Sequence, residues 1–189
     1  MDAATKIQIP ANKTWLIWLV TGLILLALFT AAKAYRSGIL SFSARPTELT
    51  RVAPASPQPP PTAIVIPRIN LNLPITQAKV TDGTWEVSAT GASHWDTSAN
   101  PGEPGNMVIY GHNQTNLFGP IRWLEIGDLI EVTNSKGQIY TYKVDQTVIV
   151  PPTDLTYILP TTTETLTLYT CTGFLDSRRH LVIAHPIAD

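Results

Sequence analysis

From residue 63 to the C-terminus, short apolar runs alternate with turn residues, a pattern typical of an all-β domain. The clearest run, 69–75, has Ile or Leu at every odd position and Asn at 70 and 72. Side chains alternate between the two faces of a strand, so this run predicts a strand with one buried face. Predicted strands cover 63–67, 70–75, 84–88, 107–112, 129–133, 138–150, 165–170 and 181–185. Short strands at this spacing indicate a sandwich or a barrel, and we favour a small closed barrel for a domain of this size.

Two connections between predicted strands also have a clear pattern. Residues 134–137, Asn-Ser-Lys-Gly, favour a hairpin turn. Phe118, Ile121 and Leu124 recur at every third position and predict one short helical segment. The domain is therefore expected to contain little helix.

The N-terminal part of the chain contains eighteen consecutive uncharged residues, 15–32. A helix of this length reaches about 27 Å, which is enough to span the hydrocarbon core of a membrane. We predict a short cytoplasmic N-terminus at 1–14 and a transmembrane anchor at 15–35. The alternatives are a buried core helix and a signal peptide cleaved near Ala-Lys-Ala at 32–34. The run is longer than the usual apolar region of a signal peptide, which favours a retained anchor.

Residues 36–62 have the composition of a linker, because six prolines lie among Ser, Ala and Thr. Such a segment favours extended polyproline conformations and acts as a semi-rigid spacer. The predicted order is therefore an anchor, a Pro-rich linker and a globular domain at 63–189.

Charge and cysteine content exclude several classes of function. The chain has thirteen Lys and Arg residues and fourteen Asp and Glu residues, so it has no excess of basic residues that would favour binding of nucleic acid. A single cysteine, Cys171, excludes an internal disulfide framework and a CxxC metal or redox site. In an exported protein an unpaired cysteine is a candidate reactive thiol.

The position of Cys171 within its predicted strand is unusual for a core cysteine. Leu166 and Leu168 share one face of the strand, whereas Cys171 falls on the other face with Tyr169. A buried structural thiol should share the leucine face. We therefore expect Cys171 to point toward a polar surface or a cleft.

A cysteine nucleophile needs a base or a cation nearby, because a free thiol has a pKa near 8.5. His112 ends a predicted strand behind Gly111, at a strand rim where catalytic residues concentrate. Arg178 or Arg179, which open the last strand, could stabilise an oxyanion. Each residue also has an ordinary explanation: a surface histidine, a solvated arginine or a cysteine that fills the core.

Together these motifs resemble the sortases, membrane-bound cysteine transpeptidases of bacterial surfaces. Residues 167–171, Thr-Leu-Tyr-Thr-Cys, match the family's TLxTC signature. Upstream, Pro-Gly-Glu-Pro-Gly-Asn at 101–106 leads into Gly111-His112, as in the family's PGxxGN…GH segment. Downstream, Arg179 begins an apolar run that ends at Ala184, similar to the strand that follows the signature. The resemblance covers almost all of 63–189.

The resemblance implies an eight-stranded closed β-barrel with Cys171 as nucleophile, His112 as general acid and base, and Arg179 as stabiliser of the oxyanion. Thr170 and Arg178 would contact the substrate, and Arg178 is also the alternative to Arg179. No cofactor is implied. Some sortases bind calcium through loop carboxylates, but those of this chain form no readable ligand pattern: Glu103, Glu125, Asp128 and Asp154.

The predicted function is a cysteine transpeptidase that cleaves an LPxTG-like C-terminal sorting signal through a thioacyl intermediate. The acceptor would be an amine of a cell-wall peptide or a pilin subunit. More Lys and Arg follow the apolar run than precede it, so the positive-inside count opposes an outside domain; the resemblance nonetheless predicts an extracellular domain. Two alternatives are a thiol peptidase that releases the acyl group to water and a non-catalytic, membrane-tethered binding module.

Overall fold

The structure, a computed structural model, describes residues 14–37, 40–41, 58–81 and 84–187. The chain divides into two compact units, Met1–Ser37 and Gly38–Asp189, and each is described by itself. The first contains helix α1 (Thr14–Ser37). Among the described residues, no helix has the length and apolarity needed to cross a membrane. The predicted anchor at 15–35 therefore stays a prediction, and the predicted segment 1–14 lies almost wholly outside the described residues.

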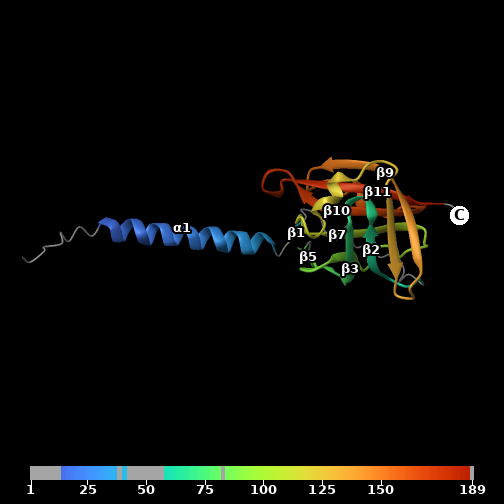
Figure 1. Cartoon of the computed structure of the whole chain (residues 1–189), viewed down its shortest axis with the longest axis horizontal. Helices are drawn as coiled ribbons and strands as arrows, with labels where there is room; N and C mark the ends of the chain where they lie inside the picture. The colour runs from blue at the N-terminus through green and yellow to red at the C-terminus, as the bar shows by residue number, and fades with distance from the viewer. Residues whose placement is uncertain (1–13, 38–39, 42–57, 82–83, 188–189) are drawn as a thin grey trace, which may run out of the picture. The chain divides into compact units, whose positions relative to one another are not determined.

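The second unit is a closed β-barrel (Figure 1). Its neighbour order is β10-β11-β9-β8-β2-β3-β6-β7, and the parallel pair β7–β10 closes the ring. The strands of the barrel are β2 (Pro61–Ile66), β3 (Leu71–Ala78), β6 (Ala92–Trp95), β7 (Gly105–Gly111), β8 (Leu129–Asn134), β9 (Ile139–Val150), β10 (Glu164–Thr172) and β11 (Arg178–Pro186). The predicted closed eight-stranded barrel is confirmed.

A three-stranded sheet in the order β1-β5-β4 accompanies the barrel. Its strands are β1 (Leu40–Ser41), β4 (Val80–Thr81) and β5 (Thr84–Trp85). β1 lies within the predicted linker, most of which (42–57) falls outside the described residues. The barrel itself begins at β2, two residues before the predicted start of the domain at 63. Short 3-10 helices connect the strands: η1 (Pro67–Ile69), η2 (Gly119–Trp123), η3 (Thr156–Ile158) and η4 (Phe174–Asp176).

One predicted strand lies outside the barrel, and one strand of the barrel was not predicted. The run 84–88 contributes only the two-residue β5, which lies outside the barrel. The eighth strand of the barrel is instead β6, which was not predicted. All four residues of β6 are buried, so its sequence lacks the alternation that predicts a half-exposed strand. The hairpin turn is confirmed, since the Gly137 amide donates to the Asn134 carbonyl at 2.9 Å. The short helical segment is confirmed as η2.

The two faces of the barrel wall contribute to two different apolar clusters. An inner cluster receives side chains from every strand of the barrel, including Leu166 and Leu168 of β10. An outer cluster lies on the opposite face of β7 and β10, and its buried members are Ala78, Trp85, Trp95, Val108, Tyr110, Val150, Leu155, Ile158, Tyr169, Cys171, Leu181 and Ile183. Strands β7 and β10 are therefore covered on both faces, as their continuous burial shows.

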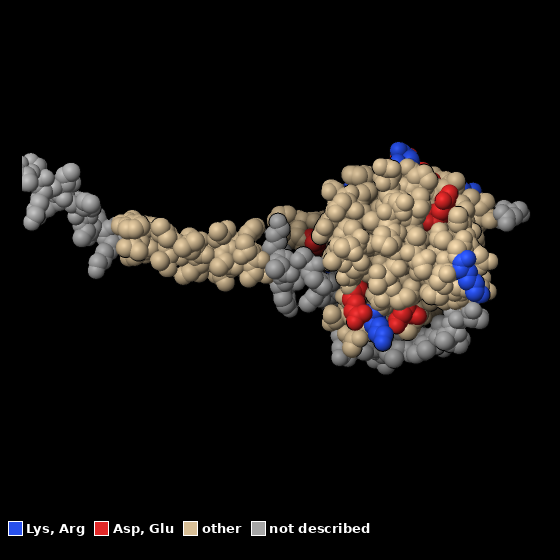
Figure 2. Space-filling view, turned by 60° about the horizontal axis from the view of Figure 1, so that its bottom comes forward, with Lys and Arg blue, Asp and Glu red and all other residues tan. Residues whose placement is uncertain are grey.

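Charged side chains are sparse on one face of the molecule. On the face shown in Figure 2, the Lys and Arg side chains are scattered and no large patch of one sign is seen. The scattered charges on this face agree with the near balance of acidic and basic residues in the sequence.

Candidate active site

Cys171 and Arg179 are direct cross-strand partners in the antiparallel pair β10–β11. Residues opposite each other in such a pair share a face, so both side chains lie on the outer face of the barrel wall. Cys171 is 7% exposed and Arg179 is 6% exposed. A guanidinium thus lies beside the thiol in a largely dry environment.

The Arg179 side chain is fixed by main-chain carbonyls of the turn that precedes it. Its Nη1 donates to the Asp176 carbonyl at 2.7 Å and to the Arg178 carbonyl at 3.0 Å. The Arg179 side chain also forms a hydrogen bond with the side chain of Tyr169, which lies two residues before Cys171 on the same face. These hydrogen bonds hold the guanidinium in place beside the thiol.

His112 reaches the site through the parallel pair β7–β10. In this register Gly111 lies opposite Thr170, and the Thr170 hydroxyl donates to the Gly111 carbonyl at 2.8 Å. His112 directly follows the end of β7, and Cys171 is the residue after Thr170 on β10. Catalytic candidates 59 positions apart in the sequence (171 minus 112) are thus brought to the same end of one strand pair.

The main chain at His112 is also held. Its carbonyl accepts bonds from the Gln114 amide at 2.8 Å and the Phe118 amide at 3.1 Å. Phe118 is fully buried in the inner cluster, and a Cβ on Gly111 would meet its Cβ at 2.9 Å. Glycine at 111 therefore allows the strand to pass close to Phe118, which fixes the start of the loop that carries His112.

Burial controls the charges of the thiol and the imidazole. It raises the pKa of the Cys171 thiol to about 11; the Arg179 guanidinium lowers that pKa and the Asp176 carboxylate raises it. Burial also lowers the pKa of His112, while Asp176 opposes the shift. At neutral pH both groups are therefore predominantly uncharged in the free protein.

Comparison with known proteins gives the family. A model of the family described as the sortase domain matches residues 64–187. The chain belongs to the sortase family. Sortase D of Bacillus subtilis (strain 168) is 36% identical over 110 residues, which are 58% of this chain and 52% of that protein. The chain thus spans about half the length of the curated relative that it matches.

Solved sortase structures share the fold. Sortase A from Corynebacterium diphtheriae is 30% identical with a TM-score of 0.59, and the match covers 70% of this chain and 63% of that chain. Sortase C1 from Streptococcus agalactiae is 28% identical with a TM-score of 0.58, over 68% of this chain and 67% of that one. The resemblance inferred from the motifs is confirmed.

In this sortase domain the two candidate arginines lie on opposite faces of β11. Arg179 shares the face of Cys171, whereas Arg178 lies opposite Thr172, on the other face, and is exposed. The Thr170 side chain is 1% exposed and also faces away from Cys171. Its hydroxyl bond to Gly111 gives it a structural role in joining β7 to β10. Substrate contacts by Thr170 and Arg178 stay predictions.

The expected surroundings of Cys171 require a correction. The strand alternation was correct, since Cys171 lies on the face opposite Leu166 and Leu168. The face is not a polar surface, however, because aromatic and aliphatic side chains of the outer cluster cover it. Alternation along one strand identifies a face but does not reveal what other segments pack on it. The thiol of this sortase domain is buried in an apolar layer.

Two further residues, Asp176 and Asn113, make contacts in the loops of the site. Asp176 has a left-handed backbone (φ 59°) in the β10–β11 turn. It also holds Arg179 through its carbonyl, and its Oδ1 accepts from Asn113 Nδ2 at 3.4 Å. Asn113 follows His112, so this contact joins the loops after His112 and Cys171. No periodic pattern in the sequence indicates it.

The carboxylates considered for calcium have partners within the protein. Glu103 accepts from the amides of Gln58 and Asn100, at 3.0 and 3.2 Å. Asp128 accepts from the Glu125 amide, and Asp154 from the Thr156 amide. In the part of the chain that the structure describes, no group of three or more His, Cys, Asp or Glu side chains is placed to hold a metal ion.

Proposed function

We propose that this sortase-family chain is a cysteine transpeptidase. The observation that carries the proposal is the pairing of Cys171 with Arg179 on one face, at the strand end that His112 also reaches. A thiol, a titratable imidazole and a permanently charged guanidinium are the groups that acyl transfer through a thioester requires. The substrate would be a surface protein with an LPxTG-like C-terminal sorting signal.

The proposed first step is attack of Cys171 Sγ on the carbonyl carbon of the scissile peptide bond. The thiol proton passes to His112, and the Arg179 guanidinium stabilises the negative oxygen of the tetrahedral intermediate. The C–N bond then breaks, His112 returns the proton to the departing amine, and a thioester remains on Cys171. Because the resting thiol and imidazole are both largely neutral, this proton transfer accompanies the attack rather than preceding it.

In the proposed second step an amine of a cell-wall peptide or a pilin subunit attacks the thioester carbon. His112 takes a proton from the attacking amine, the C–S bond breaks, and the sulfur recovers a proton from His112. The product is a new amide between the surface protein and the acceptor. Water in place of the amine would give a free acid, which is the activity of a thiol peptidase.

The test uses the full chain in detergent, an LPxTG-like peptide and a short peptide amine, with products identified by mass. We expect the joined amide from the wild-type protein, and none from Cys171→Ala at an unchanged circular dichroism spectrum. Cleavage to the free acid alone would indicate the peptidase. Full activity of Cys171→Ala would contradict the assignment of the nucleophile, and absence of both products from the wild-type chain would favour a binding module.

The location at the cell membrane is also a proposal. Residues 15–35 would anchor the chain with the domain 63–189 outside the cell, which is supported by the uncharged run 15–32 and by the helical backbone of α1. We expect the protein in the membrane fraction after alkaline carbonate washing, with the domain sensitive to protease added to protoplasts. A mature protein that begins after Ala34 would show instead that the segment is a cleaved signal peptide.

A further inference from the structure

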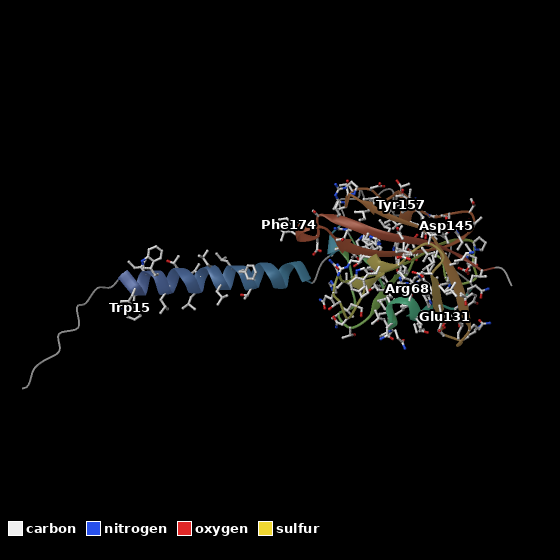
Figure 3. The ribbon with its side chains drawn as sticks, turned by 45° about the horizontal axis from the view of Figure 1, so that its top comes forward. Trp15, Arg68, Glu131, Asp145, Tyr157 and Phe174 are labelled. Carbon is white, nitrogen blue, oxygen red and sulfur yellow. The ribbon has the colours of Figure 1, made fainter. Side chains whose placement is uncertain are left out.

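The segment between β9 and β10 covers the face that carries Cys171. Leu155 and Ile158 of this segment are buried members of the outer cluster, and Tyr157, labelled in Figure 3, packs against it. Residues 155–159, which include η3, therefore pack in the outer cluster, to which Cys171 also belongs. We call residues 155–159 the covering segment.

Two buried polar side chains hold the covering segment by its main chain. The Thr167 hydroxyl donates to the Tyr157 carbonyl at 3.0 Å. The Asn106 amide Nδ2 donates to the same carbonyl at 2.9 Å and to the Leu159 carbonyl at 3.0 Å. Thr167 is fully buried and Asn106 nearly so, which makes these bonds costly to break.

Both side chains come from the two strands that form the candidate active site. Thr167 lies on β10 four residues before Cys171, on the same face and about 13 Å along the strand. Asn106 lies on β7 opposite Thr165, again on that face. Both β7 and β10 are covered on both faces, so they provide fixed points of attachment for the segment. The bonds therefore fix the covering segment relative to the strands that carry His112 and Cys171.

We propose that Thr167 and Asn106 are positioning residues, which hold residues 155–159 in place on the outer face of β10, the face that carries Cys171, before a substrate binds. Neither residue supplies a group for the chemistry, although both belong to the signature runs 167–171 and 101–106. We call the hydrogen bonds from these two side chains to the Tyr157 and Leu159 carbonyls the clamp. The clamp accounts for a threonine and an asparagine at these two buried positions. Its kinetic consequence rests on the proposed function, whereas the clamp itself is testable without it.

Amide hydrogen exchange of the full chain in detergent tests the clamp directly. The Ile158 amide donates to the Leu155 carbonyl at 3.0 Å, so its exchange reports opening of the segment. Thr167→Val keeps the size of the side chain and removes the donor. We expect Ile158 exchange to rise about three- to tenfold, the factor for one hydrogen bond, with amides of β8 unchanged. Thr167→Ser, which keeps the hydroxyl, should stay within about twofold of wild type.

Kinetics of peptide transfer test whether the held position matters. In Thr167→Val we expect a KM that rises by up to about tenfold and a kcat within about twofold of wild type, with Thr167→Ser restoring KM. The proposal is overturned if Ile158 exchange is unchanged in Thr167→Val, if Thr167→Ser raises it equally, or if exchange rises while KM does not. An inactive wild-type chain would instead refute the proposed function and leave the exchange experiment to decide on the clamp.

Discussion

Arg179 lies directly opposite Cys171 in the β10–β11 ladder, and its guanidinium counteracts the effect of burial on the thiol. Burial alone disfavours the thiolate, since the charged form loses its hydration. In the proposed mechanism the arginine therefore has two effects: it favours the Cys171 thiolate and it stabilises the oxyanion. These effects can be separated, because the first is measurable without any substrate.

Arg179→Met should raise the pKa of Cys171 further, because it removes the neighbouring positive charge. We expect alkylation of Cys171 by iodoacetamide at pH 8 to slow by about tenfold for each unit by which that pKa rises. The measurement is the second-order rate as a function of pH. Arg178→Met is the matched control, since Arg178 is exposed and lies on the other face. Equal slowing in both variants would contradict a specific effect of Arg179.

The stability of the protein should fall at alkaline pH because of Cys171. The folded-state pKa of about 11 lies above that of a free thiol, near 8.5. The unfolded chain therefore releases the thiol proton first, and the stabilisation present below pH 8.5 is lost as the pH rises to 11. The loss should reach roughly 3 kcal/mol in the free energy of unfolding. Urea titrations of wild type and Cys171→Ala across this pH range isolate the contribution of the thiol, because the alanine variant lacks it. The prediction is contradicted if the free energies of unfolding of the two proteins fall in parallel with pH.

The alternation of apolar residues predicted the barrel where strands have one exposed face, and it failed where both faces are covered. Run 69–75 contains a clean alternation and forms most of β3, which has a buried and an exposed face. β6 is buried throughout, so nothing in its four residues distinguishes a strand from a loop. The same cause explains the environment of Cys171. The segments that cover β10 lie elsewhere in the sequence, and their packing follows from the fold as a whole.

The candidate site was predictable where residue types have few alternative uses. A single cysteine, a histidine behind a glycine and an arginine at a strand start can be identified from the sequence, and the register brings their positions together. The contacts that orient them use main-chain carbonyls, such as that of Asp176 toward Arg179. Every residue type carries a carbonyl, so such contacts leave no signal in the sequence.

Asp176→Asn should lower the pKa values of both Cys171 and His112, because the carboxylate disfavours the thiolate and favours the imidazolium. Asparagine tolerates the left-handed backbone of this position, so the turn should persist. We expect faster alkylation of Cys171 at pH 8 and a lower titration midpoint of His112 in NMR spectra.

The control for this substitution is Asp145→Asn, which removes an exposed carboxylate that lies near His185. Figure 3 shows Asp145 toward the opposite end of the barrel from Phe174, the residue two positions before Asp176. The control should leave both measurements unchanged. Opposite movements of the two pKa values in Asp176→Asn would contradict a direct electrostatic effect, since one lost negative charge must shift both in the same direction.

Trp85 should contribute strongly to stability because it joins the short strand β5 to the outer cluster. It is 1% exposed, stacks on Tyr169 with centroids 6.1 Å apart, and meets Tyr110 edge-on at 4.7 Å. Trp85→Ala should lower the free energy of unfolding by about 3–5 kcal/mol in urea titrations. Trp123→Ala removes the same side chain where it is 55% exposed and should cost less than about 1 kcal/mol. Similar losses in the two variants would show that the layer over β10 adds little to the stability of the barrel.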